Sequence, residues 1–79
     1  MIQTGDKLVC TSGNAFYSVG KVYTVGEYVN DKFFEIPTGC NDEHWYATID
    51  SSGIYIRFET MESKMANAYF DKLNNQIYA

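Results

Sequence analysis

The sequence predicts a single small domain that is mainly β, with five short antiparallel strands in a small barrel or bent sheet, followed by a C-terminal α-helix. Three observations predict this fold class. The chain has 79 residues, of which 46% are hydrophobic and 16% aromatic, so we expect one core built on large rings. Short β-branched and aromatic runs alternate with turn residues up to residue 59. Beyond residue 59 the spacing of the apolar residues becomes that of a helix.

Two short runs with turn residues on either side predict the first two strands. The first run covers residues 7–11, after a Gly-Asp turn at 5–6, and the Ser-Gly-Asn sequence at 12–14 ends it. The second covers residues 22–25 and follows a Gly-Lys pair. β-branched and aromatic residues favour strands, whereas Gly, Asn and Ser favour turns.

A hairpin turn at residues 30–31, which are Asn and Asp, introduces the third strand at residues 32–36. Pro37 ends this strand, because proline has no backbone N–H to donate to a neighbouring strand. Alternation places Phe34 and Ile36 on the inner face of the sheet.

The segment 44–59, HWYATIDSSGIYIRFE, predicts a hairpin of the fourth and fifth strands around a loop from Asp50 to Gly53. In this register Ile49 lies opposite Ile54, and the pairs continue to His44 with Glu59. Successive side chains then point to opposite faces. The inner face is apolar and consists of Trp45, Ala47, Ile49, Ile54, Ile56 and Phe58. The outer face is polar and aromatic and consists of His44, Tyr46, Thr48, Tyr55, Arg57 and Glu59.

Apolar residues at every fourth position predict a helix over about 61–76. These residues are Met61, Met65, Tyr69, Leu73 and Ile77. Thr60 is the expected N-cap. The helix is expected to plug or cover the barrel, and it also offers a surface for a homodimer. If it covers the outer face of the 44–59 hairpin, that face is not free to bind a partner.

Composition and charge narrow the function classes. Ten acidic and six basic residues give a net charge of −4, which disfavours binding through phosphate neutralisation. No apolar run approaches the ~20 residues that cross a bilayer, and the N-terminus has no signal-peptide pattern. We therefore expect a cytoplasmic protein with no membrane contact. Cys10 and Cys40 are expected to be reduced thiols in such a protein.

The sequence contains no convincing catalytic or metal-binding motif. Cys40 and His44 are separated by three residues, but a structural zinc site needs four ligands, and only Cys10 could add another sulfur. A Cys/His nucleophile also needs a third group to orient its base. The glycines are spaced as turns and not as a phosphate-binding loop. We therefore expect no metal, no cofactor and no enzymatic activity.

Three strings of the sequence resemble a set of small bacteriophage proteins. They are GDKLVCT at residues 5–11, FYSVGKVYTV at 16–25 and IRFE at 56–59. The pattern of that set is GDxLVC, a loop, GKVYxV and a closing RFE. The resemblance covers about residues 5–59 and implies an SH3-like barrel and a viral origin. The helix expected after residue 59 is then an addition to the pattern.

The leading functional hypothesis is a non-catalytic viral accessory protein that binds a host protein and inhibits or redirects it, in host takeover or anti-defence. Tyr and Arg concentrate binding energy at protein interfaces, and acidic groups favour a basic partner surface. Exposed rings are also common on small domains without any binding role. The expected partner-binding residues are Tyr46, Tyr55, Arg57, Asp42, Glu43 and Asp50.

Two alternatives remain open from the sequence. The first is a barrel that binds nucleic acid or a nucleotide through base stacking and nearby lysines. The residues expected for that site are Phe16, Tyr17, Tyr28 and Lys21, with Lys7 and Lys32. The second alternative is a structural homo-oligomer or a virion component.

Overall fold

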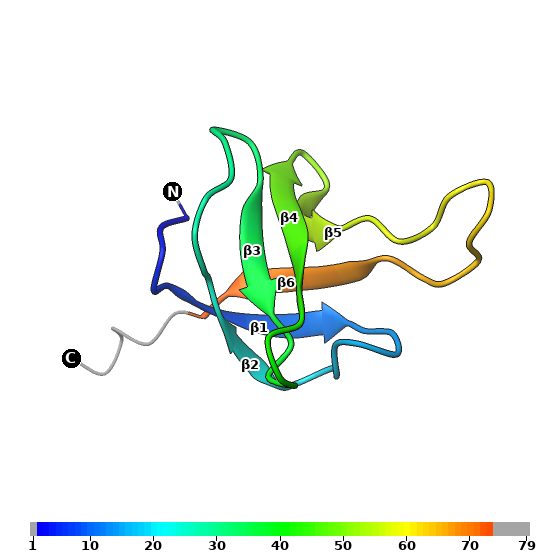
Figure 1. The fold of residues 1–79 in the computed structure, drawn as a ribbon, viewed down its shortest axis with the longest axis horizontal. Coiled ribbons are helices and arrows are strands. Elements are labelled where there is room, and N and C mark those ends of the chain that lie inside the picture. The colour runs from blue at the N-terminus through cyan, green and yellow to red at the C-terminus, as the bar shows by residue number, and fades with distance from the viewer. Residues whose placement is uncertain (1, 74–79) are drawn as a thin grey trace.

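The computed structural model describes residues 2–73, and these residues form six strands and no helix. The strands are β1 (Lys7–Ser12), β2 (Val22–Thr24), β3 (Phe34–Pro37), β4 (His44–Asp50), β5 (Gly53–Ile56) and β6 (Ala68–Lys72). They form one antiparallel sheet in the order β2-β1-β6-β5-β4-β3, which curls into a nearly closed barrel (Figure 1). The prediction of a mainly β barrel is confirmed, with one strand more than expected.

The barrel closes where the chain that leaves β2 meets β3. Gly26 N donates to Glu35 O at 2.7 Å, and Glu35 N donates to Glu27 O at 3.0 Å. Gly26 and Glu27 therefore both lie opposite Glu35 of β3, and this arrangement is a β-bulge. Continuing this register by two residues places Thr24 opposite Pro37, whose nitrogen carries no hydrogen. β2 and β3 form no ladder within residues 2–73, so a seam remains between these two strands.

Aromatic rings fill the centre of the barrel. Tyr17 is 1% exposed and lies against Tyr23 and Phe70, with ring centroids 5.0 and 5.3 Å away. Its hydroxyl donates to the carbonyl of Ile36, so the one polar group of this ring has a partner inside the core. A second group of rings, from Phe16, Trp45 and Phe58, packs beside it.

The predicted hairpin register is confirmed next to the turn. Thr48 pairs with Tyr55, and Ile49 pairs with Ile54. The β4–β5 ladder stops at Thr48 with Tyr55, so the pairs expected from Ala47 with Ile56 to His44 with Glu59 are not part of it. Ile56, the last residue of β5, pairs with Ala68 of β6. The first half of β4 instead pairs with β3, from Phe34 with Ala47 to Pro37 with His44.

The two faces of the hairpin have the predicted polarity, with one correction. Ala47, Ile54, Ile56 and Phe58 are buried and Trp45 is half-buried. Ile49, however, is 54% exposed, so its prediction as a core residue was wrong. Ile49 shares the inner face of the hairpin but lies next to the turn, beyond the end of the packed core.

The predicted C-terminal helix is wrong for residues 61–73, and its last residues, 74–76, lie outside the described part. Residues 61–67 belong to a loop, and β6 follows in the middle of the sheet. Phe70 pairs with Cys10 of β1 and with Ile54 of β5. Because β6 pairs with β1 on one side and with β5 on the other, these contacts outweigh the helical preference of its sequence. Ala68 and Phe70 are therefore buried in alternation with the outward-facing Tyr69.

The Tyr17→Phe substitution tests the buried hydroxyl in the core. It keeps the ring but removes the donor to Ile36 O, so we expect a loss of about 1–2 kcal/mol in the free energy of unfolding. Urea denaturation measures this change. Tyr46→Phe is the matched control, because the Tyr46 ring is 46% exposed and should change stability by less than about 0.5 kcal/mol. Equal effects of both variants would contradict the assignment.

Candidate binding surface on the outer face of β5 and β6

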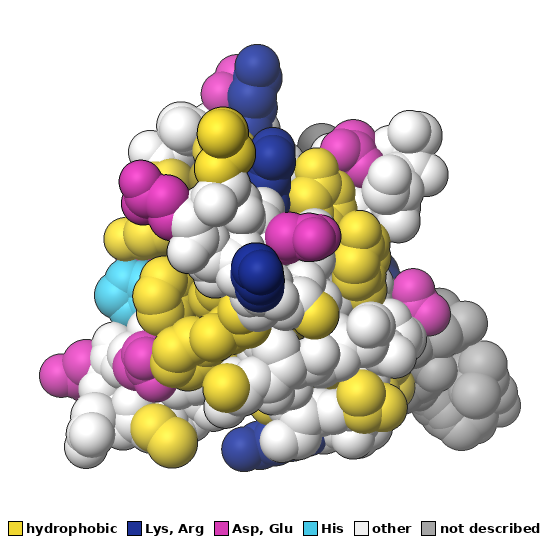
Figure 2. Space-filling view, turned by 90° about the vertical axis from the view of Figure 1, so that its right-hand side faces the viewer, with side chains coloured by type: hydrophobic (Ala, Val, Ile, Leu, Met, Phe, Trp, Pro, Cys, Tyr) yellow, Lys and Arg dark blue, Asp and Glu magenta, His cyan; other side chains and the backbone are white. Residues whose placement is uncertain are grey.

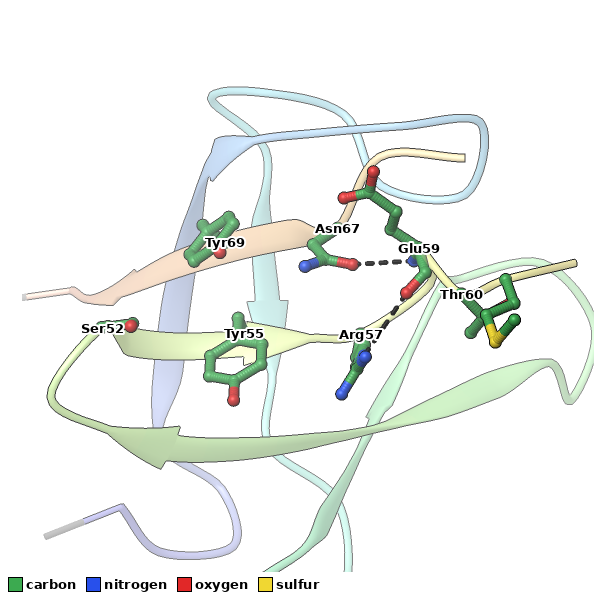
Figure 3. A pocket seen from close by; sticks show the side chains of 8 residues that line it. Ser52, Tyr55, Arg57, Glu59, Thr60, Asn67 and Tyr69 are labelled. Atoms are coloured by element: carbon green, nitrogen blue, oxygen red, sulfur yellow. Dashed lines mark hydrogen bonds between the residues drawn. The ribbon is translucent and has the colours of Figure 1, made fainter. Parts of the chain in front are cut away.

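An open groove of about 460 Å³ lies on the outer face of β5 and β6, beside the loop that joins these strands (Figure 3). We call it the outer groove. Its floor comes from two neighbouring strands and its wall from the β5–β6 loop, which projects from the barrel in Figure 1. It is lined by Ser52, Tyr55, Arg57, Glu59, Thr60, Met61, Asn67 and Tyr69.

A pair of stacked tyrosines forms the floor of the outer groove. Tyr55 and Tyr69 are direct partners in the β5–β6 ladder, and their ring centroids are 5.5 Å apart with an interplanar angle of 30°. The next residues in the same row are Thr48 on β4 and Ser12 on β1. Both side chains are small, so neither extends far over the tyrosine next to it. The pair is therefore available as a platform for a flat or apolar group.

Asp50 fixes the position of the Tyr55 hydroxyl. Ser52 N donates to Asp50 Oδ1 at 2.7 Å, and the Tyr55 hydroxyl donates to Asp50 Oδ2 at 2.8 Å. These two hydrogen bonds, first that from Ser52 and then that from Tyr55, lower the pKa of Asp50. The same contact with the carboxylate raises the pKa of Tyr55. The surface therefore combines a neutral tyrosine with an ionised aspartate at neutral pH.

Asn67 holds the chain where it leaves β5. Its Oδ1 accepts from Phe58 N at 2.8 Å and from Glu59 N at 2.9 Å. These bonds give the two amides a partner after the ladder has ended. Arg57 Nε donates to Glu59 O at 3.3 Å, as Figure 3 shows. The guanidinium of Arg57 thus lies beside the tyrosine pair, on the edge of the outer groove.

The β5–β6 loop is ordered by its own hydrogen bonds. Thr60 Oγ1 accepts from Glu62 N and Ser63 N, at 3.2 and 3.0 Å, which is a turn typical of threonine. This turn presents Met61, whose side chain is fully exposed. Figure 2 views the molecule from this side, where apolar side chains gather between acidic and basic ones.

The structure brings together only part of the predicted partner-binding set. Tyr55, Arg57 and Asp50 lie at or beside the outer groove. Tyr46 points outward from β4 but pairs with Glu35 and contacts His44 instead.

The two remaining predicted residues, Asp42 and Glu43, lie at the β3–β4 turn, where Glu43 O accepts from Thr38 N at 3.0 Å. They precede β4, whereas Asp50 ends it. At about 3.3 Å per residue, the length of this strand separates them from the outer groove.

Sequence reasoning missed Tyr69, Asn67 and Met61, because the helix prediction hid the sixth strand. The sequence does contain a pattern that indicates a strand here. Ala68 and Phe70 are buried and Tyr69 between them points outward, which is the alternation of a strand.

The residues of the nucleic-acid alternative do not share one surface. Tyr17 lies in the core, where its ring is not exposed to stack on a base. Phe16 is half-buried against Trp45. Tyr28 donates to Ile2 O at the end of the barrel, whereas Lys21 lies over the Tyr23 ring.

The residues considered for catalysis or metal binding do not come together in a site within residues 2–73. Cys10 is buried in β1, Cys40 is exposed in the β3–β4 turn, and both thiols are free. Among residues 2–73, no three His, Cys, Asp or Glu side chains converge on a point that could hold a metal ion. A helix with the length and apolarity needed to cross a bilayer is not found in this part of the chain.

Comparisons of the chain with protein-family models, with curated proteins and with solved structures give no match.

The Asn67→Ala substitution tests the support of the groove wall. It removes the acceptor of the Phe58 and Glu59 amides, so we expect their hydrogen-exchange protection to fall about tenfold. Amides of the β1–β6 ladder should keep their protection. Glu62→Ala, at the exposed tip of the same loop, is the control. Unchanged protection of Phe58 and Glu59 would show that Asn67 does not hold this segment.

The Tyr55→Phe substitution tests the Asp50 contact through its pKa. Without the phenol donor, the pKa of Asp50 should rise toward its ordinary value of 3.8, but stay below it because the Ser52 amide still donates. Because the pKa of Asp50 is lower in the folded state, the ionised carboxylate stabilises the protein at pH values above its ordinary pKa. This stabilisation is lost as the pH falls through the folded-state pKa. The destabilisation caused by Tyr55→Phe should therefore vanish in acid. Carboxyl ¹³C titration measures the pKa, and Tyr69→Phe, which lacks this bond, should leave it unchanged.

Proposed function

We propose that this chain is a small non-catalytic binding protein that uses the outer groove to hold a protein partner. The observation that carries the proposal is the stacked pair of Tyr55 and Tyr69, both half-buried, which lines the outer groove beside Arg57. Tyrosine and arginine are enriched among the residues that dominate binding energy. A stacked pair is also rigid, so binding costs little side-chain entropy there.

The position of the outer groove supports protein binding. Its floor lies on paired strands, and its wall is a loop with internal hydrogen bonds. A preorganised surface loses less freedom when a partner docks. Met61 at the loop tip adds an unbranched apolar side chain that can adapt to a partner surface.

The negative charge of the chain indicates a partner with a basic surface. The chain has ten acidic and six basic residues. Glu59 lines the outer groove, and Asp50 lies beside it, where it accepts from the Tyr55 hydroxyl. A basic partner surface gains association rate and specificity from such charges. The resemblance to small phage proteins makes a host protein in the cytoplasm the expected partner, which the chain would inhibit or redirect.

Capture from a bacterial lysate by the immobilised chain tests the proposal. We expect the wild-type chain to retain a protein partner, and the double variant Tyr69→Ala and Arg57→Ala to retain it at least about tenfold less. Both positions face outward, so the fold should persist, which a ¹H–¹⁵N spectrum verifies.

The matched control is Val19→Ala with Lys21→Ala, which removes one exposed apolar side chain and one cation from the β1–β2 connection. This control should retain the partner. Equal capture by the folded groove variant and the wild type would refute the outer groove as the site. Loss of capture after nuclease treatment, or in the Lys21 control alone, would instead favour the nucleic-acid alternative.

A further inference from the structure

Arg57 and Asn67 form a row of polar side chains next to the tyrosine pair in the outer groove. Tyr55 pairs with Tyr69 in the β5–β6 ladder, and continuing this register by two residues places Arg57 opposite Asn67. Both of these residues line the groove. Residues two apart in a strand share a face and are separated by about 7 Å. The outer groove therefore has an aromatic row and a polar row side by side.

The hydrogen bonds of Asn67 determine how its amide group is oriented. Oδ1 accepts from Phe58 N at 2.8 Å and from Glu59 N at 2.9 Å. Because both neighbours are donors, the side-chain oxygen must face them and Nδ2 must point the other way. Figure 3 shows this nitrogen turned away from Glu59, toward the side of the groove where Tyr69 lies. The hydrogens of Nδ2 have no acceptor within residues 2–73.

The guanidinium of Arg57 is a cation without a carboxylate partner in the described part of the chain. Its Nε donates to the backbone oxygen of Glu59 at 3.3 Å. Neither of the ion pairs found among residues 2–73 includes Arg57. Figure 3 shows the side-chain carboxylate of Glu59 directed away from this guanidinium. The terminal N–H donors of Arg57 are therefore free to bind a group outside the chain.

A carboxylate attached to a ring matches the two rows of the groove. A carboxylate has only acceptors, and it binds a guanidinium through paired, charge-assisted hydrogen bonds. The amide donor of Asn67 adds a further bond to the same group. A ring next to the carboxylate can pack on the tyrosine pair. An ammonium group in the same place would face the like charge of Arg57 and the donor of Asn67, so the polar row selects an anion.

The charges around the groove favour a carboxylate over a phosphate. Arg57 is the one cation among the residues that line the groove, whereas Glu59 lines it and Asp50 lies beside it. A terminal phosphate group carries more than one negative charge, and nucleic acids are bound by surfaces rich in lysine and arginine. A carboxylate carries a single charge, which one guanidinium balances.

We propose that the outer groove binds a carboxylate next to an aromatic ring, with the carboxylate held by Arg57 and Asn67 and the ring packed on the tyrosine pair. On a protein partner, this group is an aspartate or glutamate beside an aromatic residue. The inference rests on the function proposed above and adds the chemistry of the group that the groove holds. A basic partner surface can carry one such acidic group, because the net charge of the chain acts over the whole surface whereas Arg57 acts locally.

Titration of the ¹⁵N-labelled full chain with phenylacetate tests the proposal, because this probe carries one ring and one carboxylate. We expect the side-chain N–H resonances of Arg57 and Asn67 to shift, with a dissociation constant on the order of 10 mM, which is typical of so small a ligand. Phenethylamine has the same type of ring and a positive charge, and acetate has no ring. Each should bind at least about tenfold more weakly than phenylacetate.

The Asn67→Asp substitution tests the amide donor without removing the support of the loop. It keeps an oxygen for the amides of Phe58 and Glu59 but replaces the Nδ2 donor with an acceptor that repels a carboxylate. We expect phenylacetate to bind at least about tenfold more weakly, while the two amides keep their hydrogen-exchange protection. Asn41→Asp is the matched control, because it makes the same change at an exposed residue between β3 and β4, and it should bind like the wild type.

Three results would overturn this assignment. They are the absence of phenylacetate binding, equal binding by Asn67→Asp and the wild type, and tighter binding of adenosine monophosphate than of phenylacetate at the same resonances, which would assign the groove to a phosphate ligand. If lysate capture still depended on Tyr69 and Arg57, the proposed function would stand and only the carboxylate assignment would fall. Equal capture by the folded groove variant would instead refute the proposed function itself.

Discussion

The fold depends on the placement of β6 between β1 and β5. Without this strand the sheet would separate into one ladder of β1 with β2 and another of β3, β4 and β5. Phe70 contributes to both sides at once, because it pairs with Cys10 and with Ile54 and also packs on Tyr17. The sheet can curl into a barrel only when this last strand has entered it. The contacts that complete the fold therefore join residues far apart in the sequence, which is a slow kind of contact to form.

The outer groove is a consequence of the same strand. Tyr69 reaches Tyr55 only because β6 pairs with β5 in this register, and a shift by one residue would send Tyr69 into the core. Asn67, just before β6, holds the amides of Phe58 and Glu59 and so directs the chain into the projecting loop. The floor of the outer groove and the loop that forms its wall thus both depend on the pairing of β6. The segment that completes the core also builds the surface that we propose for binding.

The sequence was informative where the structure is local and misleading where it is not. The hairpin register around residues 50–53 was predictable because the turn and the alternation agree. In the C-terminal segment, Met61, Met65 and Tyr69 have helical spacing, whereas Ala68 and Phe70 have strand spacing. Only the neighbours β1 and β5 decide between the two patterns, and β1 is distant in sequence. The exposure of Ile49 was equally hidden, because alternation predicts a face and not how far the core extends beneath it.

The β4–β5 turn connects the outer groove with an apolar hollow at one end of the barrel. Ile49 lines this hollow, and the next residue, Asp50, lines it too while accepting a hydrogen bond from the hydroxyl of Tyr55 on the outer face. The bond from Ser52 N to Asp50 Oδ1 keeps the turn tight. The carboxylate of Asp50 therefore holds the turn through Ser52 and positions the hydroxyl of Tyr55 on the outer face. Because Ile49 and Asp50 are adjacent in a strand, a movement of this turn would displace both, and Thr48, which pairs with Tyr55 in the β4–β5 ladder, would move with them.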